Sequence, residues 1–385
     1  MPEPLIVAAA RTPIGRAHKG SLVDVRPEDL AALAIDSALC QVPALERDAI
    51  EDVIVGCAFP QQQQGMNVGR RVALLAGLPP SVPGTTVNRF CASSLQAIRM
   101  AAHAIRAGEG DVFVAAGVES VSRVNGYPTG DDRHPRLHGD DAVANAYVPM
   151  GITAENVARR FGVERDEMDR FAQRSHERAV AAQDAGFFER EIVPCVRPDG
   201  SVVRDDDGPR RNSSLERLGQ LDPAFLPEGT VTGGNSCSLN DGAAAVVLMS
   251  DAAAERFGVR PVARILASAV SGIEPELMGM GPVVAARRAL ERAALKVEDL
   301  DVIELNEAFA AQVLPVCREL GIDPFGDTLN PHGGAIALGH PVGLTGARIM
   351  GTLLNGLASR DGELGLEMMC VGGGQGMAMV VERVA

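Results

Sequence analysis

The chain contains two copies of one pattern, and this duplication limits the folds open to it. The segment DAIEDVIV around Val53 is echoed by EDLDVIEL around Val302. The same separation along the chain lies between Cys91 and His340. A chain of 385 residues also exceeds one ordinary hydrophobic core. We therefore expect two similar halves that pack against each other.

Each copy alternates short apolar runs with amphipathic stretches. In the first copy we predict strands over 5–10 and 53–55, and helices over 27–38 and 93–106. In the second copy we predict a helix that begins at Pro341, because proline suits the first helical position. This alternation predicts an α/β fold in which helices cover a largely parallel sheet.

The composition changes between the copies. The stretch 121–238 is rich in Pro, Asp, Arg and Asn and contains a helical pair over 153–161 and 165–185. We interpret it as a loop domain inserted into the first copy, which resumes near Asn240. The predicted domains are residues 1–120 plus 239–262, the inserted residues 121–238, and residues 263–385.

The charge balance limits the partners. With 50 acidic and 36 basic residues the net charge is −14, which argues against nucleic acid or an anionic membrane as partner. The start of the chain has no basic segment, and no apolar run is long enough to cross a bilayer. The 7 cysteines have no disulfide-like spacing, so we expect a reducing cytoplasm.

Four short motifs carry side chains suited to chemistry. Cys91 lies in NRFCASSLQA, Asn306 opens NEAFA, His340 lies in GGAIALGHP, and Cys370 precedes a glycine run that begins at Gly372. In this order and over the whole chain, these motifs resemble the thiolase family. The resemblance implies two similar halves in an αβαβα arrangement, with an inserted loop domain that binds coenzyme A (CoA).

The same resemblance implies an activity. Thiolases are acyltransferases that cleave 3-ketoacyl-CoA with CoA, or run the reverse Claisen condensation. The segment around Met150 and Phe161 is similar to degradative thiolases, which implies fatty acid β-oxidation. The implied partners are acyl-CoA and CoA, with no tightly bound cofactor, in a homodimer or homotetramer.

Cys91 lies directly before a predicted helix, where free N–H groups and the helix dipole favour a thiolate. Its small neighbours leave room for a substrate carbonyl, and a thioester on cysteine can be resolved by a second thiol. We therefore predict that Cys91 is the nucleophile. The alternative is a buried structural cysteine.

His340 lies between Gly339 and Pro341 in a rigid turn, which suits a general base. The thiolase resemblance implies that it deprotonates the nucleophile and then donates a hydrogen bond to the thioester oxygen. For Asn306 the resemblance implies a held water that completes an oxyanion hole. The alternative for Asn306 is a cap on the following helix.

Cys370 ends a predicted strand, and the glycines after it form a loop of close approach. The run lacks the third glycine of a dinucleotide fingerprint, because Met377 stands there. By resemblance, Cys370 protonates the departing enolate and deprotonates incoming CoA. The backbone N–H groups of Cys91 and Gly372 would stabilise the tetrahedral intermediate.

The CoA contacts are predicted by resemblance. Arg210 matches the arginine that contacts the adenine nucleotide in the family, and Arg211 is the alternative. Both arginines could instead belong to a solvated charged loop without a binding role. Cys237 stands where the family usually has serine beside the pantetheine, and Ser238 follows it. His134 and His138 lack further ligands at metal spacing, so we expect no metal site.

Three alternatives remain open. A ketoacyl synthase uses one cysteine and two histidines, and His332 could imitate the second histidine. A lipid-carrying relative would lack one of the reactive residues. A short-chain acetoacetyl-CoA thiolase commonly has histidine where this chain has Pro149, which favours longer substrates here. We interpret the remaining cysteines as core residues: Cys40, Cys57, Cys195 and Cys317.

Overall fold

The computed structural model describes residues 1–124, 132–139 and 143–384. Its main element is a 10-stranded sheet in the order β10-β11-β12-β9-β1-β8-β5-β3-β4, with β2 paired to β8. The copies meet where β1 (Pro4–Arg11) pairs antiparallel with β9 (Ala263–Gly272). Outward from this junction, the two copies place equivalent strands in the same order, so the duplication seen in the sequence is also seen in the sheet.

The remaining strands have the following bounds: β2 Gly15–Arg16, β3 Asp52–Gly56, β4 Gly84–Val87, β5 Val112–Ser120, β8 Asn240–Ser250, β10 Val302–Leu305, β11 Leu364–Val371 and β12 Gln375–Arg383. A separate hairpin joins β6 Cys195–Val196 to β7 Val202–Val203. The helices are α1 Pro27–Cys40, α2 Val68–Leu75, α3 Ser93–Ala107, α4 Met150–Phe161, α5 Arg165–Asp184, α6 Leu215–Gly219, α7 Asp251–Phe257, α8 Gly281–Ala293, α9 Ala310–Leu320, α10 Ala335–Leu338 and α11 Thr345–Arg360.

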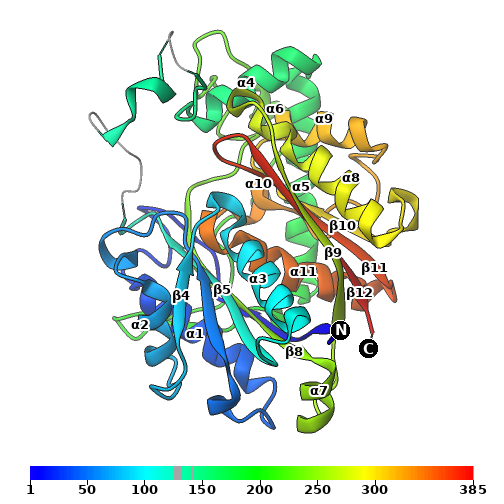
Figure 1. Cartoon of the computed structure of the whole chain (residues 1–385). Helices are drawn as coiled ribbons and strands as arrows, with labels where there is room; N and C mark the ends of the chain where they lie inside the picture. The colour runs from blue at the N-terminus through cyan, green and yellow to red at the C-terminus, as the bar shows by residue number, and fades with distance from the viewer. Residues whose placement is uncertain (125–131, 140–142, 385) are drawn as a thin grey trace.

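The three largest hydrophobic clusters separate five layers. One lies between α1, α2 and the strands of the first copy. The second holds α3 and α11 between the strands of the two copies, and Figure 1 shows these helices side by side in the interior. The third joins the strands of the second copy to α4, α5, α8 and α9. The αβαβα layering predicted from the sequence is therefore confirmed.

Alternating residues explain why both faces of the strands are apolar. In β8, Ala243, Ala245 and Val247 belong to the outer cluster. Their neighbours Ala244 and Val246 belong to the central one. Side chains of successive strand residues point to opposite faces, so a strand covered on both sides is apolar throughout.

The prediction of a largely parallel sheet was wrong. Among the described strands, the parallel pairs are β3–β4, β3–β5 and β10–β11, while the pairs around the β1–β9 junction are antiparallel. The β11 strand turns directly into β12 through a short glycine loop, and a tight turn requires antiparallel neighbours. An apolar run in the sequence does not show strand direction.

The helix after His340 starts later than predicted. Pro341 precedes a 3₁₀ turn, Val342–Leu344, and α11 begins at Thr345. The predicted helices in the inserted stretch are present as α4 and α5. No helix among the described residues is both long and apolar enough to cross a membrane.

Candidate active site

Cys91 lies in a 3₁₀ turn, Phe90–Ala92, immediately before α3. The turn is held by Ser93, whose hydroxyl donates to the Phe90 carbonyl (2.7 Å) and accepts from the Arg89 N–H (2.9 Å). Behind it, a Cβ on Gly56 would lie 2.3 Å from the Ser94 nitrogen, so only glycine fits there. The turn buries Cys91, which is 9% exposed.

Burial raises the pKa of the Cys91 thiol to about 11, while hydrogen bonds from the N–H groups of Gly372 and Cys91 itself lower it. The helix start was predicted to favour a thiolate, but desolvation outweighs these dipoles in the structure. Cys91 is therefore a neutral thiol at pH 7, which would need a base to act as a nucleophile. The Gly372 N–H points at the Cys91 sulfur. The two residues are far apart in the sequence and come from different copies of the fold, so no local motif shows that they meet.

His340 follows Gly339, whose φ of +105° requires glycine. The His340 N–H donates to Asn240 Oδ1 (3.0 Å), and the ring Nδ1 lies 2.7 Å from the Thr345 hydroxyl. That hydroxyl donates its own proton to the Pro341 carbonyl (2.9 Å), so it must accept from Nδ1–H. The tautomer set by this network leaves the lone pair on Nε2.

Burial and then the charge of Arg348 lower the pKa of His340 to about 3. The imidazole is neutral at pH 7, as a general base must be before it accepts a proton. Asn306 lies on the other side of the ring, with its Nδ2 3.5 Å from Nε2. The lone pair of His340 therefore faces the Asn306 amide.

Asn306 does not cap the next helix, so that alternative was wrong. Helix α9 begins at Ala310, its N-cap residue is Phe309, and no side chain caps it. The Asn306 N–H donates to the Met368 carbonyl (3.0 Å), which fixes the residue beside β11. Its side-chain Oδ1 is buried and has no hydrogen-bond partner among the described residues, so it remains available to a ligand or water.

Cys370 lies near the end of β11 and is fully buried. Burial, and then the nearby thiols of Cys91 and Cys237, raise its pKa well above the usual value. The three sulfurs are thus close enough to influence one another. Beyond Cys370, Gly374 has a φ of +78°, and a Cβ there would lie 2.2 Å from the Ile273 carbonyl oxygen.

Of the predicted CoA contacts, two lie near these groups. Cys237 is half-buried, and burial followed by the neighbouring Cys91 raises its pKa to about 12. The Ser238 hydroxyl donates to Asn240 Oδ1 (2.9 Å), the same oxygen that fixes the His340 backbone. Ser238 is therefore linked to His340 through Asn240.

Arg210 lies apart, in a loop packed against α5. Its N–H donates to His176 Nδ1 (3.2 Å), and its side chain is exposed. Although the side chain as a whole is exposed, partial burial of the guanidinium and then the charge of Arg16 lower the pKa of Arg210, which places two guanidinium groups near each other. The alternative, Arg211, is paired with Asp184 through Nη1 at 2.7 Å. Arg210 is thus the freer of the two cations.

The structure also places His332 and the remaining cysteines. His332 stacks on Phe187 with ring centroids 3.6 Å apart, and within the described part of the chain it contacts neither His340 nor the three thiols, so it does not supply the second histidine of a synthase. Cys40 is exposed, contrary to its predicted place in the core, whereas Cys57, Cys195 and Cys317 are buried. In residues 1–124, 132–139 and 143–384, no group of three or more His, Cys, Asp or Glu could hold a metal ion.

Sequence reasoning missed three supporting residues: Glu119, Asn240 and Thr345. Glu119 is buried and accepts from the N–H groups of Ala58 (2.9 Å) and Gly343 (2.9 Å). It therefore joins a loop of the first copy to the turn after His340. Thr345 could have been found from its place at the helix start, five residues after His340, but Asn240 and Glu119 have no local signal.

The chain matches family models for the thiolase N-terminal domain over residues 5–252 and the thiolase C-terminal domain over residues 259–383. It is 47% identical to a 3-ketoacyl-CoA thiolase of Cronobacter sakazakii over 100% of both chains. It is 45% identical to a beta-ketoadipyl-CoA thiolase of Acinetobacter baylyi, over 98% of this chain and 99% of the relative.

A solved structure, the acetyl-CoA acetyltransferase of Bacillus anthracis, is also similar. It superposes with a TM-score of 0.91 at 40% identity, over 100% of this chain and 99% of that one. This chain belongs to the thiolase family.

Proposed function

We propose that the protein cleaves 3-ketoacyl-CoA with CoA, giving acetyl-CoA and a shortened acyl-CoA, with Cys91 as the nucleophile. The observation that carries the proposal is the meeting of Cys91 and Gly372, which lie in different copies of the fold. The Gly372 N–H is directed at the Cys91 sulfur, where a bound thioester oxygen would also need a donor. The names of the relatives support the same reaction.

In the first half-reaction, His340 Nε2 accepts the Cys91 proton, and the thiolate attacks the 3-keto carbon. The bond between C2 and C3 breaks, its electron pair stays on the acetyl-CoA enolate, and the Cys370 thiol protonates that carbon. In the second, the Cys370 thiolate takes the proton of the incoming CoA thiol, and the CoA sulfur attacks the acyl-Cys91 thioester. The Cys91 thiolate leaves and recovers its proton from His340.

The remaining groups bind and polarise substrate. Asn306, whose Oδ1 is free, holds a water that with His340 stabilises the enolate oxygen. Cys237 and Ser238 line the pantetheine, and the exposed Arg210 meets the adenine nucleotide. CoA acts as a co-substrate, and no tightly bound cofactor takes part.

The assay follows the magnesium enolate absorbance of acetoacetyl-CoA after CoA is added. Wild type should remove this absorbance, and Cys91→Ala should not, because no other group can form the acyl-enzyme. Cys40→Ala is the matched control, because that thiol is exposed and outside the site. Wild type that leaves the absorbance unchanged, with longer 3-ketoacyl-CoA also uncleaved, would favour the lipid-carrying alternative.

We further infer a homodimer or homotetramer in the cytoplasm. The β4 strand ends the order of the sheet, and exposed apolar side chains gather in the segments around it: Met66, Leu74, Leu75 and Phe90. An uncovered sheet edge beside apolar residues favours association with another copy. All seven cysteines are free, which supports a reducing compartment. Light scattering during size-exclusion chromatography tests the assembly; a monomer at micromolar concentration would contradict it.

A further inference from the structure

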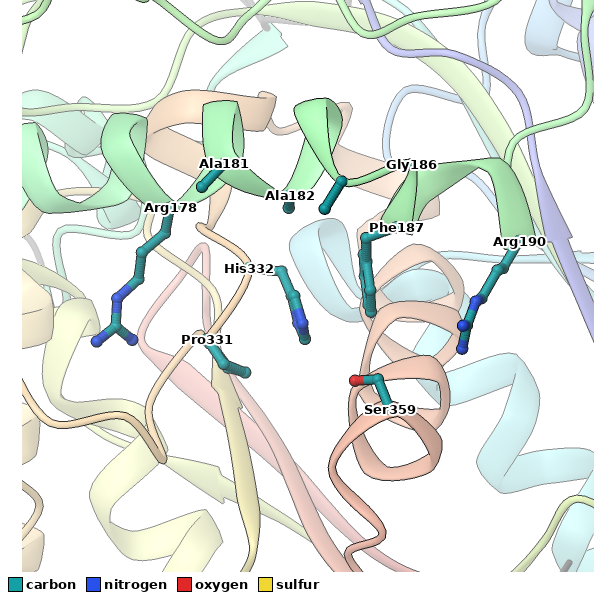
Figure 2. A pocket seen from close by; sticks show the side chains of 10 residues that line it. Arg178, Ala181, Ala182, Gly186, Phe187, Arg190, Pro331, His332 and Ser359 are labelled. Atoms are coloured by element: carbon teal, nitrogen blue, oxygen red, sulfur yellow. The ribbon is translucent and has the colours of Figure 1, made fainter.

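A cavity lies away from the cysteines, between the C-terminal ends of α5 and α11 (Figure 2). Its volume is about 420 Å³, within the range of sites for small molecules. The side chains that define it are Arg178, Ala182, Phe187, Arg190, His332 and Ser359. With 3.6 residues per turn, Arg178 and Ala182 lie on the face of α5 opposite His176, the residue that contacts the Arg210 loop. The cavity is therefore separate from the proposed CoA contacts.

One wall of the cavity is a stacked pair of rings. His332 and Phe187 lie with their planes 9° apart and their centroids 3.6 Å apart. The His332 Nδ1 is buried against α11, 3.7 Å from the position that a Cβ on Gly356 would occupy. It has no hydrogen-bond partner among the described residues. Burial, then Arg360 and Arg178, lower the pKa of His332 to about 4, so the ring is neutral at pH 7. The pair forms a flat, uncharged wall.

The charged groups around this wall are arginines. Figure 2 shows Arg178 and Arg190 on either side of the rings. Arg178 is engaged at both Nη atoms, through Nη1 with the Leu329 carbonyl (3.0 Å) and neighbouring carbonyls and through Nη2 with Asp327 (2.8 Å), so it contributes charge rather than free Nη donors. Arg190 and Arg360 are exposed, and neither forms an ion pair or side-chain hydrogen bond with another described residue.

Acidic side chains only partly balance this group. None of the residues that line the cavity is Asp or Glu. Asp327 is taken up by Arg178, and the exposed Glu189 lies beside Gly186, with its Cδ 3.4 Å from where a side chain at Gly186 would begin. In a protein with a net charge of −14, unpaired arginines around one cavity are a local reversal of charge.

We propose that this cavity binds a small phosphate-bearing anion beside the His332–Phe187 wall, held by Arg178 and Arg190, which line the cavity, and by the neighbouring Arg360, which lies outside its lining. Guanidinium groups present paired N–H donors that match the oxygens of phosphate. Ser359 also lines the cavity, but its hydroxyl donates to the Gly356 carbonyl (3.0 Å), so the arginines supply the donors. The ligand can be an inorganic phosphate compound or a nucleotide, which share this anionic group. The site does not depend on the thiolase reaction.

The test measures binding to the full-length protein by calorimetry, with pyrophosphate and adenosine 5′-monophosphate as probes. Arg190→Gln and Arg360→Gln should each raise Kd at least about tenfold, since a lost charge-assisted hydrogen bond costs more than a neutral one. Two variants serve as matched controls. Arg160→Gln removes an exposed, unpaired arginine on α4, and Arg210→Gln removes the proposed CoA contact.

The outcomes separate the explanations. Binding of both probes indicates that the phosphate group suffices, and tighter binding of the nucleotide indicates that its base uses the ring wall. If neither probe binds to wild type, the arginines only neutralise the helix ends and the proposal fails. It also fails if Arg210→Gln, and not Arg190→Gln, removes binding, because the probes then occupy the CoA site. Equal affinity for succinate would overturn the assignment to phosphate.

Discussion

The Thr345 hydroxyl lies 2.7 Å from His340 Nδ1 and donates its own proton to the Pro341 carbonyl oxygen. A threonine at the start of α11 thereby selects the tautomer of the imidazole. Without this acceptor, the proton could move to Nε2, the nitrogen that faces Asn306. The geometry makes Thr345 a positioning residue for the proposed base.

We expect Thr345→Val to lower kcat/KM by about 10- to 100-fold, a part of what general acid–base catalysis usually supplies. The loss should fall on kcat, because the substrate contacts remain. Thr345→Ser restores the hydroxyl and should recover most of the activity. If the serine variant is as slow as the valine variant, the role of Thr345 is in packing and not in the tautomer.

Glu119 should make stability depend on pH. Burial raises its pKa from 4.5 to about 7, against hydrogen bonds from Gln64, Ala58 and Gly343 that lower it. The folded state therefore holds this proton at a pH where the unfolded chain has lost it. The protonated Glu119 therefore stabilises the folded state. This stabilisation is fully present below pH 4.5 and is lost as pH rises through about 7, and the free energy of unfolding falls by up to about 3 kcal/mol in all.

Urea unfolding of wild type and Glu119→Gln at several pH values between 4.5 and 8 measures this contribution. The difference in unfolding free energy between the two proteins should shrink as pH rises. Comparison with the variant is needed because Glu304, whose pKa is raised to about 8 by burial, titrates in the same direction. A difference that is constant over this range would show that Glu119 keeps one protonation state.

The fold and the proposed site could be predicted to different degrees. The repeat around Val53 and Val302 indicated the two halves, because equivalent residues stand in equivalent strands. The direction of the strands could not be read, since it depends on connections and not on apolar patterns. Local motifs located Cys91, His340 and Asn306, but the high pKa of Cys91 comes from burial by distant segments. The stacking of Phe187 on His332 likewise could not be predicted from the sequence, because the two residues lie in distant segments.

Arg11 should be important for stability. It is buried in β1 and bonds Glu191 through Nε (2.6 Å) and Asp206 through Nη1 (2.8 Å). Both acids belong to the inserted stretch, so one side chain fastens that stretch to the sheet. Arg11→Met leaves two buried carboxylates without their cation and should cost about 3–5 kcal/mol.

Chemical denaturation measures this loss, and an exposed pair provides the control. Arg211 and Asp184 are both exposed, so Arg211→Gln should leave the unfolding free energy nearly unchanged. If the two variants are equally stable, the buried pair contributes no more than a surface pair, and the inserted stretch is held by its apolar contacts.

Loss of Cys370 should slow both half-reactions without preventing acylation of Cys91. With Cys370→Ala, His340 can still activate Cys91 for attack, but the enolate released in the first half-reaction must take its proton from water. Exchange with CoA should slow by at least about 10²-fold, because the group that protonates the enolate carbon and deprotonates the CoA thiol is gone. Acid trapping and mass spectrometry should find the acyl group on Cys91. An adduct on Cys237, or a variant with normal turnover, would remove Cys370 from the proposed role.

The last prediction concerns the length of the acyl chain. Pro149 is the N-cap of α4 and leads into Met150, whose sulfur lies 3.8 Å from where a side chain at Gly372 would begin. The next residue, Gly151, packs on Phe225 so closely that a Cβ would lie 2.1 Å from its ring. The Pro149 segment thus lies over the glycine loop of the proposed site, with an aromatic ring behind it.

An apolar wall at this place should accept 3-ketoacyl-CoA longer than acetoacetyl-CoA. Proline offers no polar side chain there and fixes the loop. Each added methylene changes discrimination by only about 1–3 kcal/mol, so the preference should be graded. Comparing kcat/KM for acetoacetyl-CoA and 3-ketooctanoyl-CoA measures it, and Pro149→His should shift the ratio toward the shorter substrate. If wild type does not turn over the longer substrate, an acetoacetyl-CoA thiolase is the better assignment, because the wall then closes the pocket.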